Sequence, residues 1–334
     1  MIKEKTIKPA QIKIGIVLVF VLSAFLALRF GSAELSLKDF LSALLKRPGH
    51  ETFSIILYSV RLPRVIASIL AGVGLSVSGV LLQSVTGNDL AAPNIVGVNS
   101  GAGFVMIFLM HFLPQFGFLR PFGAFLGAFA ATMIILLICA KTSVLPSGVI
   151  LAGVAVTAVL NAGISFMSYY DPDILSDYNH FSVGGLGGSE TKELLLPAVM
   201  IFICLGISVL LSQKIQALTL GDSLAFSLGI KVKQLRFLCL LIASASAAAV
   251  VSFAGLLGFV GLIVPHITRK LLGYEVGGLF AFAPVVGATV VLLGDLFGRT
   301  VFAPSEIPVG IVMAFIGAPF FLTIILRRGR NASV

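Results

Sequence analysis

Apolar residues occur along the chain in long blocks, and short polar stretches separate these blocks. Each block holds roughly twenty residues, about the length that an α-helix needs to cross the hydrocarbon core of a bilayer. Because lipid offers the backbone no hydrogen-bond partners, each block must be helical or buried in a bundle. The pattern therefore predicts an all-α, polytopic membrane bundle of about ten transmembrane helices, in a single domain over residues 1–334. The predicted spans are residues 14–32, 62–83, 94–112, 121–140, 148–168, 193–212, 236–255, 257–271, 279–298 and 307–326.

The composition agrees with a membrane protein. Hydrophobic residues make up 58% of the chain and charged residues 11%, whereas a soluble domain carries about a quarter charged residues. The first apolar block is longer than the hydrophobic region of a signal peptide and lacks a small-residue cleavage pattern, so we interpret it as the first transmembrane helix. Cys139, Cys204 and Cys239 lie in apolar blocks without CxxC spacing, which predicts buried, inert thiols.

The distribution of Lys and Arg predicts an orientation. Ten spans place both termini on the same side, and fourteen of the 23 basic residues then fall on that side and nine on the other. Since cytoplasmic loops are enriched in Lys and Arg, we expect a multi-pass protein of the plasma membrane with both termini cytoplasmic. The net charge of +9 is spread over these loops, so it indicates topology and contact with lipid and does not indicate nucleic-acid binding.

Three arginines on the outer side have two possible roles. Arg61 and Arg64 flank the start of the second span, and Arg299 follows the ninth. They could be interface anchors whose side chains extend towards lipid headgroups. Alternatively they could form a cationic rim that docks an acidic partner, because a guanidinium binds a carboxylate through two parallel hydrogen bonds.

The longest inner loop, residues 213–235, has a different pattern. Within its stretch LTLGDSLAFSLGI, at residues 218–230, three leucines recur four residues apart and two glycines flank a turn. These residues are Leu220, Leu224, Leu228, Gly221 and Gly229. Asp222 and Ser223 suit a helix N-terminus, where a side-chain oxygen can cap free amides. We predict a short amphipathic helix, which either lies on the membrane surface or fits a groove on a cytoplasmic protein.

Glycine is dense in two kinds of place. The stretch FSVGGLGG at residues 181–188 follows the longest outer loop, and we expect a broken segment there, near the mouth of a cavity. Gly-x-x-x-Gly spacing, as in Gly97–Gly101 and Gly123–Gly127, allows close approach of helices. That second feature is ordinary packing and does not by itself indicate transport.

Residues that would carry chemistry are scarce. The chain has no GxxxxGK[ST] phosphate-binding loop and no HExxH, and its four histidines are far apart. Asp295 is the one acidic residue set firmly in a predicted span, whereas ion-coupled carriers normally have more intramembrane ionisable groups. No catalytic residue, metal ligand or cofactor is therefore predicted, and we expect a transport subunit that is not an enzyme and is energised by another protein. The alternatives are an ATP-independent carrier, since some sodium sites consist of carbonyls and hydroxyls, and a membrane-embedded enzyme, which would need a cluster of ionisable residues at one depth.

Several motifs together resemble the permease subunits of ATP-binding-cassette (ABC) importers for iron-siderophores, haem and cobalamin, the FecCD or BtuC-like type II importers. In chain order they are RLPR at 61–64, AGVGLSVSGVLLQSVTGNDLAAPNIVGVNSGAG at 71–103, LAGVA at 151–155, GGLGG at 184–188, LGDSLAFSLG at 220–229, FVGLIVPHITRKLLG at 259–273, GDLFGR at 294–299, EIPVGI at 306–311 and GAPFF at 317–321. Phe181 departs from the Trp that many members have. After Gly273 the family usually has an acidic residue and then His-Arg, and residues 274–276 lack that basic pair.

The resemblance implies a transport complex. Two copies of the chain, or the chain and a sister permease, would form a dimer around the translocation path. Two ABC ATPase subunits would bind the cytoplasmic face, and an extracytoplasmic binding protein would deliver the substrate. The implied cargo is an iron complex, most commonly a ferric siderophore, with haem or cobalamin as alternatives that the permease sequence does not discriminate.

The resemblance also implies roles for individual residues. Arginines at the positions of Arg61, Arg64 and Arg299 face glutamates of the binding protein. The inner gate falls at Pro146 and Ser147, where the family often has two small hydroxyl residues. The coupling helix that contacts the ATPase matches Leu220, Gly221, Asp222, Ala225, Leu228 and Gly229.

Overall fold

The computed structural model describes residues 9–33, 36–46, 49, 51–142, 147–188 and 190–331 of the 334 residues. Over these residues the fold is a helical bundle without strands, as the apolar blocks predict. Ten longer helices follow the ten predicted spans in order. They are α1 (Pro9–Arg29), α4 (Leu62–Thr86), α5 (Val98–Phe112), α6 (Arg120–Thr142), α7 (Ser147–Tyr170), α9 (Leu195–Thr219), α11 (Val232–Ala254), α12 (Val260–Leu272), α13 (Val276–Thr300) and α14 (Val309–Asn331).

Seven helical segments of the described chain are long and apolar enough to cross a membrane, judged by length and composition. Helix α5 and the apolar part of α14, Val309–Ile324, are shorter, and α12 has 13 residues. The prediction of ten spans is therefore correct for the positions of the helices. Helices α5 and α12 are shorter than a typical full crossing of about twenty residues, and so is the apolar part of α14.

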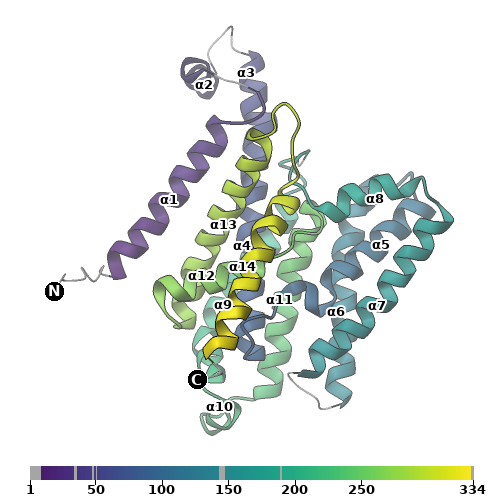
Figure 1. Cartoon of the computed structure of the whole chain (residues 1–334), viewed down its shortest axis with the longest axis vertical. Coiled ribbons are helices and arrows are strands. Elements are labelled where there is room, and N and C mark those ends of the chain that lie inside the picture. The colour runs from purple at the N-terminus through teal and green to yellow at the C-terminus, as the bar shows by residue number, and fades with distance from the viewer. Residues whose placement is uncertain are drawn as a thin grey trace.

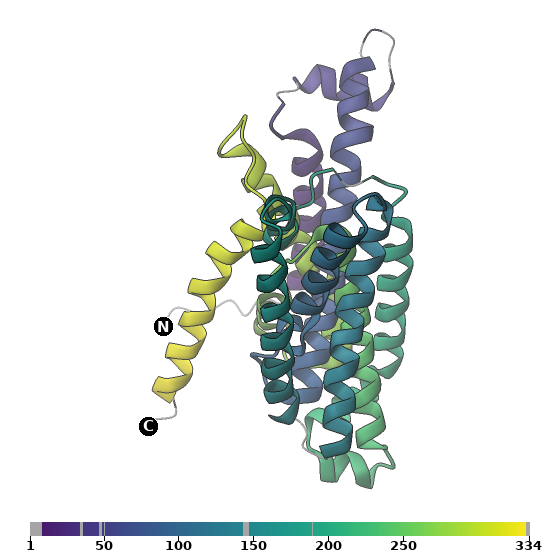
Figure 2. The same ribbon diagram turned by 90° about the vertical axis from the view of Figure 1, so that its right-hand side faces the viewer.

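Short elements mark the two ends of the bundle (Figures 1 and 2). One end carries α2 (Leu37–Leu44), α3 (Glu51–Ile55) and the segment 301–308, and α8 (Ile174–Val183) lies near it. We call this the outer end, following the predicted orientation. The opposite, inner end carries α10 (Asp222–Ser227). The remaining short elements are the π-helical turn η1 (Ile56–Arg61), which runs into α4, and the 3-10 turns η2 (Pro93–Val96) and η3 (Gly117–Leu119).

Helix α4 is the centre of the core. It packs against α9, α11, α12 and α13, and most of its residues are buried. Its glycines bring backbones into direct contact, because a Cβ atom on Gly72 would overlap the carbonyl oxygen of Gly287 in α13 and one on Gly79 would overlap that of Gly261 in α12. Gly101 and Gly127 form the same kind of seam between α5 and α6. Small residues thus fix the distances between these helices, as they commonly do in membrane bundles.

Two helices are poorly covered by the rest of the chain. Helix α7 packs on α5 and α6, and α14 packs on α12 and α13. Large apolar side chains on both remain exposed, including Leu151 (75%) and Val159 (73%) on α7 and Phe315 (78%) on α14. These faces are available to lipid, to a second chain or to a transport path.

Candidate functional sites at the two ends of the bundle

The three arginines expected at the outer side do lie at the outer end of the bundle, but they are buried. Arg61 is 3% exposed, Arg64 is 9% exposed and Arg299 is 2% exposed. Arg64 and Arg299 contact Asp295, which is 2% exposed. Glu306, in the segment before α14, pairs with Arg64, and the charge of Arg61 lies near that of Arg299. We call these five residues the outer arginine cluster.

Arg64 is the hub of the outer arginine cluster. Its Nε atom donates to both carboxylate oxygens of Asp295, at 3.0 and 3.1 Å, and its Nη1 atom donates to Glu306 Oε2 at 2.6 Å. Arg299 lies one turn after Asp295 on α13, and its Nε atom is 3.4 Å from Asp295 Oδ2. Buried charges persist only when paired in this way, so the network ties α4, α13 and the 301–308 segment together.

Arg61 binds backbone instead of carboxylates. Its guanidinium donates to the carbonyl oxygens of Leu28, Arg29 and Ala33, and Arg299 Nη2 donates to that of Ala27. The last carbonyls of a helix have no partner within the helix, and a cation near that end is favourable. Two arginines therefore cap the C-terminal end of α1 and fix it to the bundle.

Glu306 is the most exposed carboxylate of the outer arginine cluster, with a side chain 35% exposed. It accepts a hydrogen bond from the Ser32 hydroxyl at 2.8 Å and one from Arg64. Burial alone would raise the pKa of Glu306, but these hydrogen bonds and the charges of Arg64 and Arg299 outweigh burial and lower it. Next to it, Ile307 N donates to Gly298 O at 2.9 Å and returns the segment to α13.

The sequence anticipated the position of the three arginines and missed their partners. The sequence alone shows Asp295 as a lone carboxylate in a span and Glu306 as part of the EIPVGI motif. The available signal was the spacing of Asp295 and Arg299, four residues apart and hence on one face of a helix. The long-range pairs with Arg64 could not be read from spacing.

A cavity of about 330 Å³ opens beside the outer arginine cluster. Its wall includes Arg64, Glu306, His180 and the glycine-rich segment at residues 185–187. Helix α8 ends at Val183, as the glycine density predicts, and the chain continues without helix through this segment. Gly185 N donates to Ala254 O at 2.9 Å and Gly310 N donates to Gly184 O at 3.1 Å, which anchors the broken segment to α11 and α14.

At the inner end, α10 is the short helix predicted in the loop 213–235. Gly221 and Gly229 stand on either side of it with φ of +118° and +77°, a region that other residues rarely adopt. The prediction that Asp222 or Ser223 caps the helix is wrong, because Gly221 occupies the N-cap position and no side chain caps there. The Asp222 carboxylate is instead bound to Arg236.

Helix α10 is fixed on one face and bare on the other. Ala225 is fully buried against the bundle, whereas Leu220 is 66% exposed, Phe226 is 76% exposed and Leu228 is 65% exposed. A short helix that points large apolar side chains away from its own chain is typical of a surface that fits a groove on a partner.

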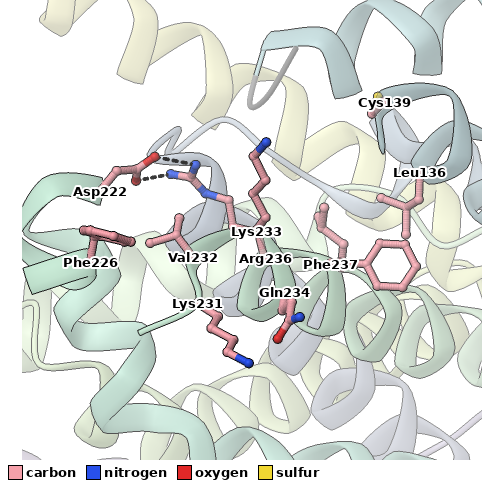
Figure 3. Close-up of a pocket in the computed structure, with 11 residues that line it drawn as sticks. Leu136, Cys139, Asp222, Phe226, Lys231, Val232, Lys233, Gln234, Arg236 and Phe237 are labelled. Atoms are coloured by element: carbon pink, nitrogen blue, oxygen red, sulfur yellow. Dashed lines mark hydrogen bonds and ion pairs between the residues drawn. The ribbon is translucent and has the colours of Figure 1, made fainter. Parts of the chain in front are cut away.

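Arg236, in the second turn of α11, connects three elements at the inner end. Its Nη2 and Nη1 atoms donate to the two carboxylate oxygens of Asp222 at 2.7 and 2.8 Å (Figure 3). Its Nε atom donates to Val85 O, in the last turn of α4, at 3.1 Å. A cavity of about 790 Å³ lies beside this pair, and its apolar wall includes Leu136 and Phe237 (Figure 3).

Other predicted positions have simpler outcomes. Cys139, Cys204 and Cys239 are buried, as predicted, and none of the three is in a disulfide bond. Pro146 of the predicted inner gate lies outside the described residues, and Ser147 is the first residue of α7, so the gate stays a prediction. Among the described residues, no three His, Cys, Asp or Glu side chains are grouped as metal ligands would be.

Comparison with known proteins gives one consistent result. The sequence model of the FecCD transport family matches residues 14–327. The chain is 37% identical to the Fe(3+)-citrate import system permease protein YfmE of Bacillus subtilis over 84% of each protein. It is 34% identical to the iron(3+)-hydroxamate import system permease protein FhuG of the same organism, over 97% of this chain and 99% of the relative. A solved structure described as an inward-facing metal-chelate type ABC transporter superposes with a TM-score of 0.83, at 29% identity over 95% of this chain and 99% of that one.

Proposed function

The chain belongs to the FecCD transport family, and from that premise we propose that it is the membrane-spanning permease of an ABC importer for a ferric siderophore. The family is one of transport subunits of ABC importers. The observation that carries the proposal to this chain is the inner end, where α10 is anchored by the buried Ala225 and presents exposed apolar side chains. Such a surface supports binding of a separate ATPase, which a chain without a phosphate-binding loop requires.

The proposed ATPase contact is made by α10 and its two flanking turns. Leu220 and Leu228 would enter a groove of the ATPase, while Gly221 and Gly229 hold the turns in which they stand. Asp222 and Ala225 would keep the helix fixed to the bundle. One such contact per permease, in a dimer of permeases, requires two ATPase subunits at the cytoplasmic face.

The proposed translocation path lies between two permease chains. Helices α7 and α14 leave broad apolar faces uncovered, and a second copy or a sister permease would cover them. A path of this kind suits a bulky cargo that the permease binds only weakly. The affinity for the cargo would then reside in the extracytoplasmic binding protein. Ser147 of the predicted gate begins α7 at the inner end, where closure would seal such a path.

The outer arginine cluster is the proposed docking site of the extracytoplasmic binding protein. In it the guanidinium groups of Arg64 and Arg299 meet the carboxylates of Asp295 and Glu306, and Arg64 lines the cavity beside the cluster. An acidic side chain of a partner that enters this cavity would share Arg64 with Glu306. Burial of the arginines favours docking at a preformed cavity over contact with an exposed rim.

The test is reconstitution of the chain in liposomes, with and without the ATPase and binding protein encoded beside it. Uptake of radioactive iron as ferric citrate or ferric hydroxamate should require ATP inside the compartment that holds the ATPase, and it should require the binding protein on the other side. In the same liposomes, protease added to one face of the membrane should cleave both termini only when it is on the side that holds the ATPase.

Each other outcome identifies an alternative. Iron uptake by the chain alone, driven by an ion gradient, would contradict the proposal and indicate a secondary carrier. ATP-dependent uptake of haem or cobalamin in place of both ferric chelates would keep the importer and change its cargo.

A further inference from the structure

We propose that Arg236 is a positioning residue that transmits displacement of α10 to the inner end of α4 and, through it, to α12. This inference rests on the proposed function, in which an ATPase moves α10. It concerns a residue outside the sequence motif that first pointed to the coupling helix, and it is carried by the hydrogen bonds of one guanidinium.

The first step is the link between α10 and Arg236. Gly221 and Gly229 place turns at both ends of α10, so the short helix is joined to α9 and α11 through two glycine turns. Besides the packing of Ala225, a bidentate ion pair fastens α10 to the bundle. The Asp222 side chain is 54% exposed and that of Arg236 is 14% exposed. The fixed member of the pair is therefore the arginine, and the reachable member is on the helix that a partner would push.

The second step is the bond from Arg236 Nε to Val85 O. Val85 is 1% exposed and stands one residue before the end of α4, where helix carbonyls lack partners within the helix. The guanidinium satisfies that carbonyl and adds a favourable cation at the negative end of the helix. Because one rigid planar group makes the bonds to Asp222 and to Val85, movement of the carboxylate changes the position of the end of α4.

The third step continues from α4 to α12. In the last turns of α4, Gln83 accepts a hydrogen bond from Arg269 Nη1 of α12 and donates to Leu262 O at 3.3 Å. Just beyond α4, Asp89 Oδ1 lies 3.3 Å from Arg269 Nη1. Arg269 is 7% exposed and Gln83 is 2% exposed. The end of α4 is thus hydrogen-bonded to both Arg236 of α11 and Arg269 of α12.

The geometry explains why arginine and not lysine stands at position 236. Three donors on a planar fork reach two carboxylate oxygens and a carbonyl at once, whereas an ammonium on a flexible stem holds no such fixed arrangement. A purely structural arginine would affect the amount of folded complex. A transmitting arginine would affect how much substrate moves for each ATP hydrolysed.

The experiment uses the whole reconstituted complex and measures iron taken up per ATP hydrolysed. Arg236→Lys should keep assembly with the ATPase and lower that ratio by roughly 5-fold or more, the lower range of typical coupling factors. The double variant Asp222→Arg with Arg236→Asp restores an ion pair without the bond to Val85. The ratio of iron taken up to ATP hydrolysed should therefore return only part of the way to the wild-type value. Lys214→Ala, at an exposed lysine of α9, is the control and should leave the ratio unchanged.

Two results would overturn the inference. One is an Arg236→Lys complex with the wild-type ratio, and the other is full recovery by the double variant. If Arg236→Lys does not yield folded protein, Asp222→Asn at the exposed member of the pair must lower the ratio in its place, and an unchanged ratio there also overturns the inference. A wild-type complex without ATP-dependent uptake would instead contradict the proposed function.

Discussion

The two ends of the bundle each contain an arginine–aspartate pair, and the pairs differ in what they leave exposed. At the outer end the side chains of Arg64 and Asp295 are 10% and 2% exposed. At the inner end those of Arg236 and Asp222 are 14% and 54% exposed. In both pairs the arginine is enclosed by the bundle, but only at the inner end does the carboxylate face outwards.

This difference indicates that the two arginine–aspartate pairs have different roles. A buried pair cannot lose one member without leaving an uncompensated charge in a poorly solvated place, so the outer pair fixes the shape of a surface. An exposed carboxylate gives little stability and can be displaced at low cost, so the inner pair suits a part that moves. The following predictions test the contrast from the largest expected effect to the smallest.

The largest effect is expected for Asp295→Asn. This change leaves Arg64 and Arg299 without their shared carboxylate and should lower the free energy of unfolding by about 3–5 kcal/mol. The measurement is thermal unfolding of the purified chain in detergent. The matched control is Asp222→Asn at the inner end, which should cost about 1 kcal/mol or less. Equal shifts for the two variants would remove the distinction between the ends.

A smaller and local effect is expected for Arg61→Gln. The variant withdraws hydrogen bonds from the last carbonyls of α1, and a group left unsatisfied costs about 1–3 kcal/mol. Hydrogen exchange should accelerate in the last turn of α1 more than in α13. Arg120→Gln is the control at the same end, since Arg120 Nη1 is 3.9 Å from the carboxylate of Asp177, whose side chain is 63% exposed, and exchange in α1 should not respond to it.

The smallest effect is expected for Glu306→Gln, and it should depend on pH. Because the folded chain holds the pKa of Glu306 below its ordinary value, the carboxylate stabilises the fold at neutral pH. That contribution is lost as the pH falls below about 4.3, the ordinary value for glutamate, and through the lowered pKa. The wild type should unfold at a higher temperature than the variant at pH 7, with a gap that closes by acidification. A gap independent of pH would contradict the assigned charge.

The sequence predicted the bundle well for a physical reason. Crossing lipid requires a run of apolar residues, and such a run is visible in one dimension, which is why all ten predicted spans coincide with helices. The same holds for α10, whose flanking glycines and leucine spacing are local features. The sequence did not predict which residues pair across long distances in the chain. Arg64 meets Asp295 and Glu306, and Arg236 meets Val85, across more than 150 residues of chain, and no local pattern records which partner a buried arginine selects.

The glycine seams have a consequence for how this protein can change shape. Where backbone touches backbone, as at Gly72 with Gly287 and Gly79 with Gly261, two helices have almost no room to slide or tilt against each other. We therefore expect helices α4, α12 and α13 to move as one rigid unit, and α5 with α6 as a second. The transport cycle has few degrees of freedom left, and they lie at the joints between these pieces and in the loosely covered α7 and α14. An added methyl group on a seam would then change the relative positions of two helices along their whole length and not only at the substituted residue.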